Sequence, residues 1–305
     1  MSTQERTLQG RVVAITGGTR GIGRATAAAL AREGARVALA GTDAGRAQST
    51  AAEIGGETRG YAVDVRDRAS FKAFLDAAEH DLGPLDALIN NAGIMPVGPF
   101  LDETDEMAQR QVDTNLHGMV NGSKEALSRM LPRRSGHVLN LSSITGRGGF
   151  PHIATYCATK FAIYGLTDAL RIEFAEAGID FSCVLPALVD TEMSSGVKAG
   201  FGIKKSSPEE VADAIVAVLR KPRFAVYVPR VMGPLIKLNA VVPDRPRDAI
   251  GRLFEADKVM LSADRPSRSG YERRIAGARQ ERELPAEEQL DEVDAAVVET
   301  SQAAE

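Results

Sequence analysis

Short apolar runs alternate with longer helical patterns along residues 8–228, and this alternation limits the folds open to the chain more than any other feature. The runs are rich in β-branched and aliphatic residues and lack strict polar alternation, as strands buried on both faces do. The predicted strands are Arg11–Thr16, Arg36–Ala40, Gly60–Val63, Leu85–Asn90, His137–Leu141, Asp180–Leu185 and Ala225–Val228.

Helical patterns lie between these strands. Clear examples are Ile22–Glu33, Ser70–Leu82 and Pro208–Arg220, and Ser207 before the last one is a favoured helix cap. A repeated strand–helix–strand order predicts a parallel sheet with right-handed crossovers and helices on both faces. The fold class is therefore α/β with a doubly wound parallel sheet, which binds ligands beyond the carboxyl ends of its strands.

The composition is that of an ordinary globular protein, with 44% apolar and 26% charged residues among 305. Two cysteines are too few for a disulfide framework, and residues 1–10 lack the apolar core of a signal peptide. The longest apolar candidate, residues 226–242, is interrupted by Arg230 and Lys237, so no membrane span is predicted. A formal net charge of −4 argues against a nucleic-acid partner. We therefore expect a cytoplasmic protein.

Charge is unevenly distributed along the chain. Residues 281–305 hold nine acidic residues and one basic residue, Arg282, a net charge of −8, so the preceding 280 residues carry +4. The acidic end contains no aromatic residue and cannot bury enough apolar surface to offset the entropy of ordering it. It is predicted to be a disordered tail.

A glycine-rich loop joins the first predicted strand to the first predicted helix, where residues 16–23 read TGGTRGIG. Glycines here let the backbone turn sharply and approach a pyrophosphate, which then lies on the amides of the helix N-terminus. A glycine-rich turn without a ligand is the alternative, but the strand–turn–helix context favours a dinucleotide site. The residues predicted to contact the cofactor here are Gly17, Thr19, Arg20, Gly21, Ile22 and Gly23.

Three further motifs follow later strands. Residues 90–93 read NNAG after the fourth strand, and Ser142 and Ser143 follow the fifth. Tyr156 lies thirteen residues past Ser143, and Lys160 lies four residues further on. With these motifs in order, residues 8–228 resemble the short-chain dehydrogenase/reductase family, and in particular its actinobacterial members with a C-terminal extension. The resemblance implies a Rossmann fold and an NAD(P)-dependent oxidoreductase that interconverts an alcohol and a ketone.

The tyrosine and the lysine also make chemical sense without the family. Four residues apart on a helix, Tyr156 and Lys160 share a face, where the ammonium group favours the tyrosinate. An unperturbed tyrosine has a pKa of about 10, too high for a base at neutral pH, so a cation that lowers this pKa is needed. Ser143 can donate a hydrogen bond to the substrate oxygen on which charge develops.

The resemblance assigns roles to four residues. It implies that Tyr156 is the acid/base, Ser143 orients the substrate, Lys160 also holds the nicotinamide ribose, and Asn115 supports a proton-relay water. Ala187 departs from the family, which usually has glycine after the preceding proline, and we expect the turn to be kept. The resemblance also implies cofactor contacts at Asp64, Val65, Asn91, Ala92, Gly93, Pro186, Val189 and Thr191.

The choice between NADP and NAD depends on the end of the second predicted strand, where residues 40–43 read AGTD. The acid that selects NAD in the family aligns with Gly41, which is not acidic. Asp43, beside Thr42, fits the general rule for a ribose-binding acid. Arg20 supplies a cation for the 2′-phosphate of NADP, and Arg46 can assist it. NADP is therefore favoured, with NAD as the alternative.

Each candidate residue also has an ordinary structural explanation. A helical tyrosine usually packs, a lone lysine is usually a solvated charge, and Ser143 or Asn115 can bond the backbone. The spaced set behind a glycine loop favours catalysis. The rival hypotheses are a cofactor-binding regulator without turnover and a lipid- or membrane-surface protein. The histidines and cysteines show no metal-ligand spacing, so no metal is predicted, and Cys157 is interpreted as packing.

Apolar residues adjoin the motifs and indicate a hydrophobic alcohol or ketone as the substrate. They are Ile94, Met95, Pro96, Ile144, Phe150 and Leu188. Members of the family are commonly dimers or tetramers, so the resemblance implies a homodimer or homotetramer.

The chain is expected to form one Rossmann-type domain over residues 8–229, an amphipathic extension over residues 230–280 and the acidic tail. The extension carries apolar residues at helical spacing and a second apolar run, namely Val231, Leu235, Leu238 and Val242, then Ile250, Leu253, Phe254 and Leu261. Basic residues surround them, namely Arg230, Lys237, Arg245, Arg247, Arg252 and Lys258. Two interpretations stay open: peripheral contact with an anionic membrane, or packing against the chain's own core or a neighbouring subunit.

Overall fold

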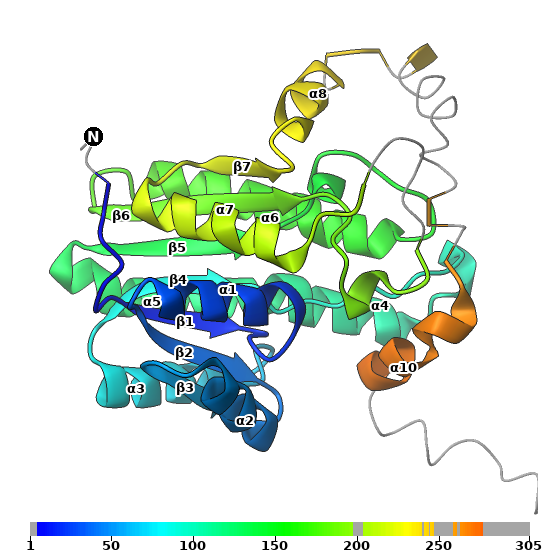
Figure 1. Cartoon of the computed structure of the whole chain (residues 1–305). Coiled ribbons are helices and arrows are strands. Elements are labelled where there is room, and N and C mark those ends of the chain that lie inside the picture. Colours follow the sequence, from blue (N-terminus) through cyan, green and yellow to red (C-terminus); the bar gives the residue numbers. More distant parts are fainter. Residues whose placement is uncertain are drawn as a thin grey trace, which may run out of the picture. The chain divides into compact units, whose positions relative to one another are not determined.

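The computed structural model describes residues 5–197, 204–239, 241–243, 245–246, 259–260 and 263–276, and contains a seven-stranded parallel sheet (Figure 1). The spatial order of the strands is β3-β2-β1-β4-β5-β6-β7. The strands are β1 Val12–Thr16, β2 Arg36–Gly41, β3 Thr58–Ala62, β4 Leu85–Asn90, β5 Gly136–Leu141, β6 Ile179–Pro186 and β7 Ala225–Val228. Each strand predicted from the sequence is present, with its ends shifted by at most two residues.

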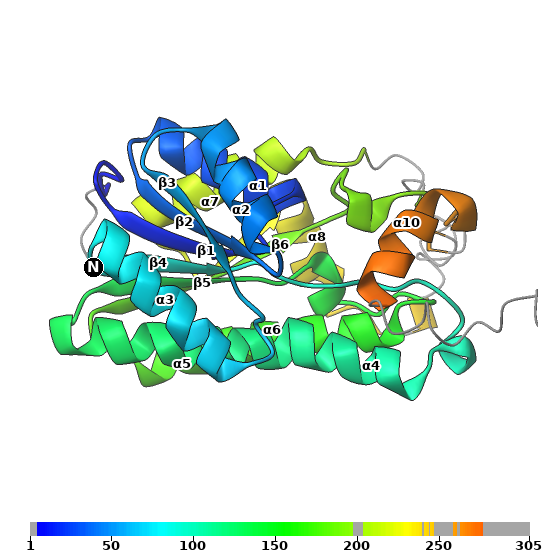
Figure 2. The ribbon, with the colours of Figure 1, turned by 90° about the horizontal axis from the view of Figure 1, so that it is seen from below.

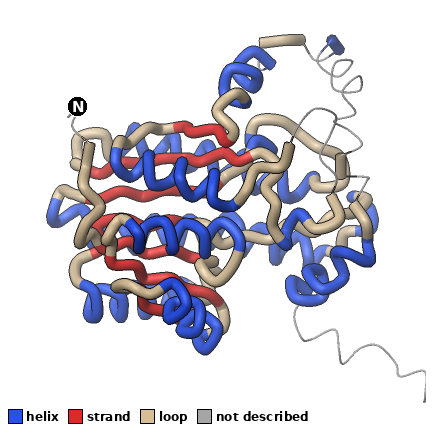
Figure 3. The backbone as a smooth tube through the Cα atoms, viewed as in Figure 1, coloured by secondary structure: helices blue, strands red, loops and turns tan. Residues whose placement is uncertain are grey.

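Helices cover both faces of the sheet (Figure 2; strands are red in Figure 3). One face carries α1 Gly21–Arg32, α2 Ala44–Ile54 and α7 Pro208–Arg220, and the other carries α3 Arg68–Leu82, α5 Gly118–Met130 and α6 Ala154–Glu173. The remaining elements are α4 Asp105–Gln111, a π-helical turn η2 Val112–His117, α8 Met232–Asn239, α10 Arg265–Ala276 and the 3₁₀ turns η1 Phe100–Asp102, η3 Leu131–Arg133, η4 Ile144–Gly146 and η5 Glu192–Ser194. The predicted doubly wound α/β fold is confirmed.

Strand β1 shows why the predicted strands are apolar throughout. Successive side chains of a strand point to opposite faces. Val13 and Ile15 pack into the apolar cluster beneath α1 and α7, whereas Val12 and Ala14 pack into the cluster beneath α3 and α5. Both faces of the strand are buried, so both sets of positions must be apolar.

Helix α7 begins where the sequence predicts it. Ser207 accepts a hydrogen bond from the Glu210 amide, the Glu210 carboxylate accepts one from the Ser207 amide, and Pro208 occupies the first turn. This capping box satisfies two amides that the helix cannot satisfy itself. The helix therefore starts at a fixed residue and packs against α1.

The strand order reverses next to β1, which pairs with β2 on one side and with β4 on the other. In a doubly wound sheet the crevice at such a point, beyond the carboxyl ends of the strands, is where a ligand binds. The glycine loop follows β1 and the NNAG motif follows β4. The topology thus brings together two motifs that are about 70 residues apart in the sequence.

Contacts divide the chain into a unit of residues 1–268 and a unit of residues 269–305. The first unit holds the sheet and α8. In the second unit the structure describes residues 269–276, which form the remainder of α10. The predicted acidic tail, residues 281–305, lies outside the described residues, and so does the second apolar run of the extension, formed by Ile250, Leu253, Phe254 and Leu261.

The apolar stripe predicted after β7 is only partly as expected. Helix α8 ends at Asn239, so Val242 lies beyond it. The helix packs on the cluster of β6 and β7 through Met232 and Ile236 instead of through the predicted stripe. Residues of that stripe are 52–62% exposed, namely Val231, Leu235 and Leu238. The interpretation that this stripe packs against the chain's own core is therefore wrong for these three residues.

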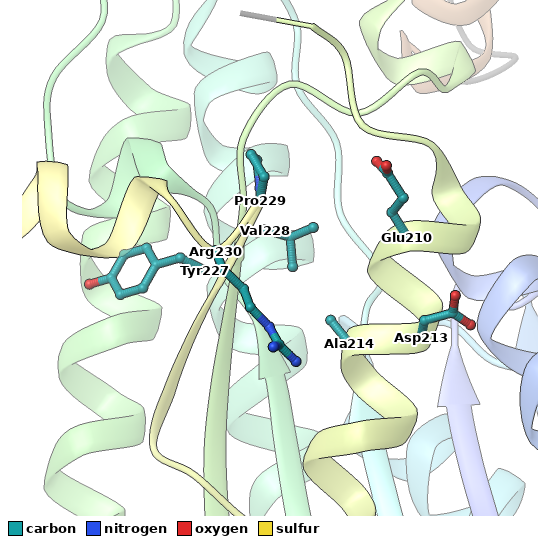
Figure 4. A pocket seen from close by; sticks show the side chains of 7 residues that line it. All are labelled: Glu210, Asp213, Ala214, Tyr227, Val228, Pro229 and Arg230. Carbon is teal, nitrogen blue, oxygen red and sulfur yellow. The ribbon is translucent and has the colours of Figure 1, made fainter.

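A surface pocket of about 270 Å³ lies between α7 and the end of β7 (Figure 4). Glu210, Asp213 and Ala214 line it from α7, and residues 227–230 line it from the other side. None of the residues predicted to bind cofactor or substrate is among its lining residues. This pocket is thus separate from the candidate site.

Candidate active site

The glycine loop is shaped by close backbone approaches that exclude side chains. Gly17 has a φ of +64°, and a Cβ atom there would lie 2.9 Å from Nδ2 of Asn91. A Cβ at Gly23 would lie 2.2 Å from the Gly17 carbonyl oxygen. Arg20, at the N-cap of α1, provides no side-chain cap for the helix amides. A loop packed this tightly at an uncapped helix N-terminus fits a pyrophosphate.

Asn91 of the NNAG motif links β4 to the glycine loop. Its Nδ2 donates to the carbonyl oxygens of Thr16 at 2.8 Å and Gly17 at 3.1 Å, and its own amide donates to Oγ1 of Thr16 at 3.0 Å. The Ala92 amide donates to the same hydroxyl at 3.2 Å. The sequence predicted cofactor contact at Asn91. In the structure its side chain holds the glycine loop of residues 16–23, which is called the cradle below, against the end of β4.

Asn115 lies in the π-helical turn between α4 and α5, an element that sequence reasoning missed. The side chain is fully buried. Its Oδ1 accepts a hydrogen bond from the Ile94 amide at 2.8 Å, and its Nδ2 donates to the Ile94 carbonyl at 2.9 Å and to Oγ1 of Thr159 at 3.2 Å. Asn115 therefore ties the segment after β4 to α6. Turns of this kind inside helices are frequent at functional sites.

Gly93 brings the backbone after β4 against the predicted catalytic residues. A Cβ atom at this position would lie 3.2 Å from Oδ1 of Asn115 and 3.8 Å from Nζ of Lys160. Both side chains therefore face the same short stretch of backbone. This closeness could not be read from the sequence, where the three residues span 67 positions.

Helix α6 carries Tyr156 and Lys160 on one face, as predicted. Nζ of Lys160 lies 5.4 Å from the centroid of the Tyr156 ring and donates a hydrogen bond to the Leu141 carbonyl at 2.9 Å. Lys160 is 4% exposed, and desolvation lowers the pKa of its ammonium group to about 8. A charge on this lysine is thus held beside the tyrosine in a poorly solvated place, where electrostatic effects are strong.

The two serines after β5 have different environments. Oγ of Ser143 donates to the Pro186 carbonyl at 3.3 Å and accepts from the Thr145 amide at 3.2 Å. Oγ of Ser142 donates to the Lys160 carbonyl at 2.8 Å and so binds β5 to α6. The longer bond of Ser143 leaves its hydroxyl the easier of the two to redirect toward a substrate.

An apolar cluster surrounds Tyr156. Its buried members are Met95, Ile153, Tyr156, Cys157, Val197 and Met260, with Val97, Phe150, Leu188, Met193, Val259 and Ala263 packed against them. Of the residues predicted to form an apolar pocket, Met95, Phe150 and Leu188 are in this cluster. Ile144 packs with Tyr227 in another cluster, which corrects that prediction. Val259, Met260 and Ala263 were missed, because nothing in the sequence indicates that they return to the tyrosine.

Cys157 belongs to the same cluster. Its Sγ lies 3.9 Å from the Phe150 carbonyl oxygen, and burial raises the pKa of the thiol. A thiol with a raised pKa is a poor nucleophile. Its environment agrees with the interpretation of Cys157 as a packing residue.

Two residues predicted to bind the adenosine side of the cofactor are engaged with their own neighbours. Asp43 caps α2 by accepting a hydrogen bond from the Arg46 amide at 2.9 Å. The Asp64 carboxylate is paired with the Arg66 guanidinium at 2.6 Å, which holds the pKa of Asp64 below its usual value. A Cβ at Gly41 would lie 2.9 Å from Cγ2 of Thr19, so the end of β2 lies against the glycine loop.

Three other residues predicted to contact the cofactor differ in their exposure to solvent. Val65 is 7% exposed, and a Cβ at Gly118 would lie 2.7 Å from its Cγ2, so it packs on the start of α5. Thr42 is exposed at the end of β2, and Ile22 packs from the first turn of α1 against the core.

The segment after β6 reaches over the start of α1. The Ala187 amide donates to the Val228 carbonyl at 2.8 Å and so continues the pairing of β6 with β7. Val189 forms an isolated bridge with Ser206, and Thr191 is the N-cap of η5. A Cβ at Gly21 would lie 3.2 Å from Cγ2 of Thr191. The glycine loop and the segment after β6 therefore face each other.

Arg20 and Glu192 connect these same two segments. Nη1 of Arg20 lies 3.0 Å from Oε2 of Glu192, and both side chains are partly exposed. A pair of this kind is worth about 1 kcal/mol or less, so a phosphate can take its place on Arg20. Neither the sequence motif nor its spacing indicated that Glu192 would meet the arginine.

Within the part of the chain that the structure describes, no three or more histidine, cysteine, aspartate or glutamate residues are grouped so as to hold a metal ion. Among these same residues, no helix is long and apolar enough to cross a bilayer. A parallel sheet with a glycine loop opening a helix at its switch point defines a dinucleotide-binding protein of the Rossmann type.

Comparison with known proteins narrows this class. The family model described as short chain dehydrogenase matches residues 11–200. The chain is 34% identical over 235 residues to the probable oxidoreductase EphD of Mycobacterium tuberculosis, covering 70% of this chain and 40% of that protein. It is 36% identical over 230 residues to 2-(S)-hydroxypropyl-CoM dehydrogenase 3 of Xanthobacter autotrophicus, covering 70% of this chain and 90% of that protein.

Solved structures agree with this fold. A short chain dehydrogenase/reductase from Burkholderia phymatum, in complex with NAD, superposes with a TM-score of 0.70 at 24% identity, covering 77% of this chain and 94% of that one. A short chain dehydrogenase/reductase family protein superposes with a TM-score of 0.67 at 31% identity, covering 73% and 97%.

The chain belongs to the short-chain dehydrogenase family, and relatives that it matches are named dehydrogenases. The predicted family is confirmed, and the names of these relatives support the predicted enzyme class. The chain spans 40% of the length of the Mycobacterium relative, so that protein's activity as a whole is not transferred to it.

Proposed function

We propose that the enzyme transfers a hydride between a nicotinamide cofactor and a hydrophobic alcohol or ketone, with Tyr156 as the acid/base. The observation that carries this proposal is the position of the buried Lys160, whose Nζ lies 5.4 Å from the Tyr156 ring centroid. The cradle of Gly17, Gly21 and Gly23 fits a dinucleotide because added side chains would collide with the backbone or with facing residues.

The proposed chemistry assigns one task to each residue. The nicotinamide ring, when bound, accepts or supplies the hydride. Oη of Tyr156 exchanges a proton with the substrate oxygen, and the Lys160 cation favours the tyrosinate that this exchange leaves. Ser143 donates a hydrogen bond to the same oxygen as charge develops on it. Asn115 holds the Ile94 peptide and Thr159 in place and, following the family, supports a proton-relay water.

The apolar cluster around Tyr156 supports a hydrophobic substrate. Its members are aliphatic, sulfur-containing or aromatic, with Met95, Val197 and Met260 among the buried ones. Burial of apolar substrate surface against such a wall is favourable by about 25 cal/mol per Å². Steric fit then decides which alcohols and ketones are accepted.

We further propose that NADP is preferred over NAD. The end of β2 carries Gly41 where an acid would bind the ribose hydroxyls, and Asp43 is engaged as a helix cap. Arg20 lies at the cradle and can exchange its partner Glu192 for a 2′-phosphate. NAD is the alternative cofactor. Titration of the protein with NADPH and NADH measures the preference, and tighter binding of NADH would contradict it.

Replacement of Tyr156 tests the proposed mechanism. Tyr156→Phe keeps the ring but removes the proton-carrying oxygen, so kcat should fall roughly 100- to 10,000-fold while the Kd of the cofactor stays nearly unchanged. Tyr164→Phe is the matched control on the same helix, since Tyr164 packs against Arg147 and Phe224. Near-normal turnover by Tyr156→Phe would refute the mechanism and favour a different acid/base.

The state of assembly and the membrane contact are also proposals. An exposed apolar surface supports docking of a second copy or of an anionic membrane; it consists of Val231, just before α8, and of Leu235 and Leu238 of α8, with Lys237 beside them. Light scattering measures the expected homodimer or homotetramer. Sedimentation with anionic and with neutral liposomes measures the membrane contact, and binding to neither rejects it. No contact of the described residues favours a regulator without turnover.

A further inference from the structure

Arg268 is the largest fully buried side chain among the described residues, although it comes from the C-terminal extension. It is 1% exposed. Its Nη1 donates hydrogen bonds to the carbonyl oxygens of Met193 at 2.9 Å and Ser195 at 3.1 Å, and its Nη2 donates to the Met95 carbonyl at 2.9 Å. A buried guanidinium group is costly unless its donors are satisfied, so these bonds fix its position.

The three carbonyl groups belong to two different segments at the carboxyl edge of the sheet. Met95 follows β4 and is next to Ile94, the residue held by Asn115. Met193 and Ser195 lie at η5, in the segment after β6. Arg268 therefore joins the segment that adjoins the catalytic asparagine to the segment that faces the glycine loop.

The described residues just before Arg268, namely 259–260 and 263–264, make two further contacts with this region. The Asp264 amide donates to the Gly196 carbonyl at 3.1 Å. Gly196 has a φ of +71°, and a Cβ atom there would lie 2.7 Å from the Asp264 carbonyl oxygen, so glycine is required for the approach. Met260 is 7% exposed and lies in the apolar cluster of Tyr156, with Val259 and Ala263 packed against that cluster.

We infer that Val259, Met260, Ala263 and Asp264 form a wall of the substrate pocket, in which Met260 limits the size of the substrate, and that Arg268 is a positioning residue that holds the wall in place. This inference rests on the proposed function. Met260 acts by steric fit beside Tyr156. Arg268 touches no reacting atom and acts through the Met95 and Met193–Ser195 backbone.

The first experiment measures size selectivity. Wild type, Met260→Ala and Met260→Phe are assayed on a series of straight-chain 2-ketones of increasing length with NADPH, and with NADH as the second cofactor. Met260→Ala should raise the ratio of kcat/KM for long over short ketones by about tenfold, and Met260→Phe should lower it. An unchanged ratio in both variants overturns the role of Met260.

The second experiment measures positioning by Arg268. Arg268→Met removes the hydrogen bonds to Met193, Ser195 and Met95 and puts an unbranched apolar side chain in place of the arginine, whereas Arg268→Lys keeps the charge. Arg268→Met should raise KM for the preferred ketone about tenfold or more, with a smaller change in kcat and an unchanged Kd for the cofactor. Arg268→Lys should recover part of this loss. The control is Arg273→Met, which removes an exposed arginine of the same helix.

Hydrogen exchange separates this inference from the proposed function, because it needs no turnover. The Ser195 and Val197 amides donate to backbone carbonyls of the segment that Arg268 holds. In Arg268→Met their exchange should accelerate at least tenfold, whereas the amides of β1 should keep their wild-type rates. Unchanged exchange together with an unchanged KM overturns the positioning role. Faster exchange in a protein that turns over no ketone keeps the anchor and rejects the proposed function instead.

Discussion

The cofactor half and the substrate half of the site are built in different ways. In the cofactor half, the cradle comes from one loop of eight consecutive residues, and its shape depends on backbone atoms that approach where Gly17 and Gly23 have no side chains. In the substrate half, the apolar cluster of Tyr156 draws on four separate segments, and the hydrogen bond from Arg268 to Met95 spans 173 residues. A cradle made of backbone is thus specified locally, whereas a pocket made of side chains depends on distant parts of the chain.

The largest effect is expected where the cradle has no free space. In Gly23→Ala the new Cβ would meet the Gly17 carbonyl at 2.2 Å and Nδ2 of Asn91 at 2.7 Å, so the loop must move. The Kd of the cofactor, measured by fluorescence titration, should rise more than about 100-fold, which is about 2.7 kcal/mol. Gly45→Ala in α2 is the control, because its nearest contact is an ordinary 3.4 Å. Tight cofactor binding by Gly23→Ala would show that the close backbone approach at Gly23 is not needed to bind the cofactor.

Lys160 is proposed to act on Tyr156 in the substrate half and on the nicotinamide ribose in the cofactor half. Its titration therefore tests whether one charge serves both halves of the site. Desolvation lowers the pKa of Lys160 to about 8, so the ammonium group is present below that pH and is lost above it. In the direction of ketone reduction, kcat/KM should fall by up to about tenfold per pH unit above about pH 8, as for a single essential acid. Lys160→Arg retains a charge throughout this range and should move the fall to higher pH. A fall at the same pH in Lys160→Arg assigns it to another group.

The sequence predicted the cofactor half better than the substrate half, for a physical reason. Strands buried on both faces and a glycine-rich turn leave patterns within ten residues, so β1, α1 and the cradle could be located directly. The π-helical turn around Asn115 leaves no such pattern, because its backbone conformation is decided by contacts with Ile94 and Thr159. Arg268 lies in a polar stretch of the sequence, where an arginine is expected to be exposed to solvent. Only its tertiary contacts show that it is buried.

A smaller effect is expected at the ion pair that connects the halves. Glu192→Gln removes the negative partner of Arg20, so a 2′-phosphate no longer has to displace a carboxylate, and NADPH should bind several-fold more tightly. Arg20→Ala should weaken NADPH and leave NADH nearly unchanged. Isothermal titration of each variant with NADPH and with NADH gives four Kd values, and each is compared with the wild-type Kd for the same cofactor. Equal effects of Arg20→Ala on the two cofactors would place the 2′-phosphate elsewhere, with Arg46 as the next candidate.

The smallest effect on either half is expected at His137, in the sheet that supports both. His137 is buried, its Nε2 lies 2.8 Å from Oγ of Ser182, and desolvation lowers the pKa of the imidazole to about 4. The unfolded chain takes up a proton below about pH 6.5 and the folded chain does not, so acidification from 6.5 toward 4 favours unfolding. The free energy of unfolding should therefore fall by at most about 1.4 kcal/mol per pH unit from this group. His137→Gln should flatten that slope in urea denaturation while leaving cofactor Kd and KM at pH 7.5 unchanged. An equal slope in the two proteins would assign the acid sensitivity to the carboxylates, and a changed KM would show that the sheet interior and the substrate pocket are coupled.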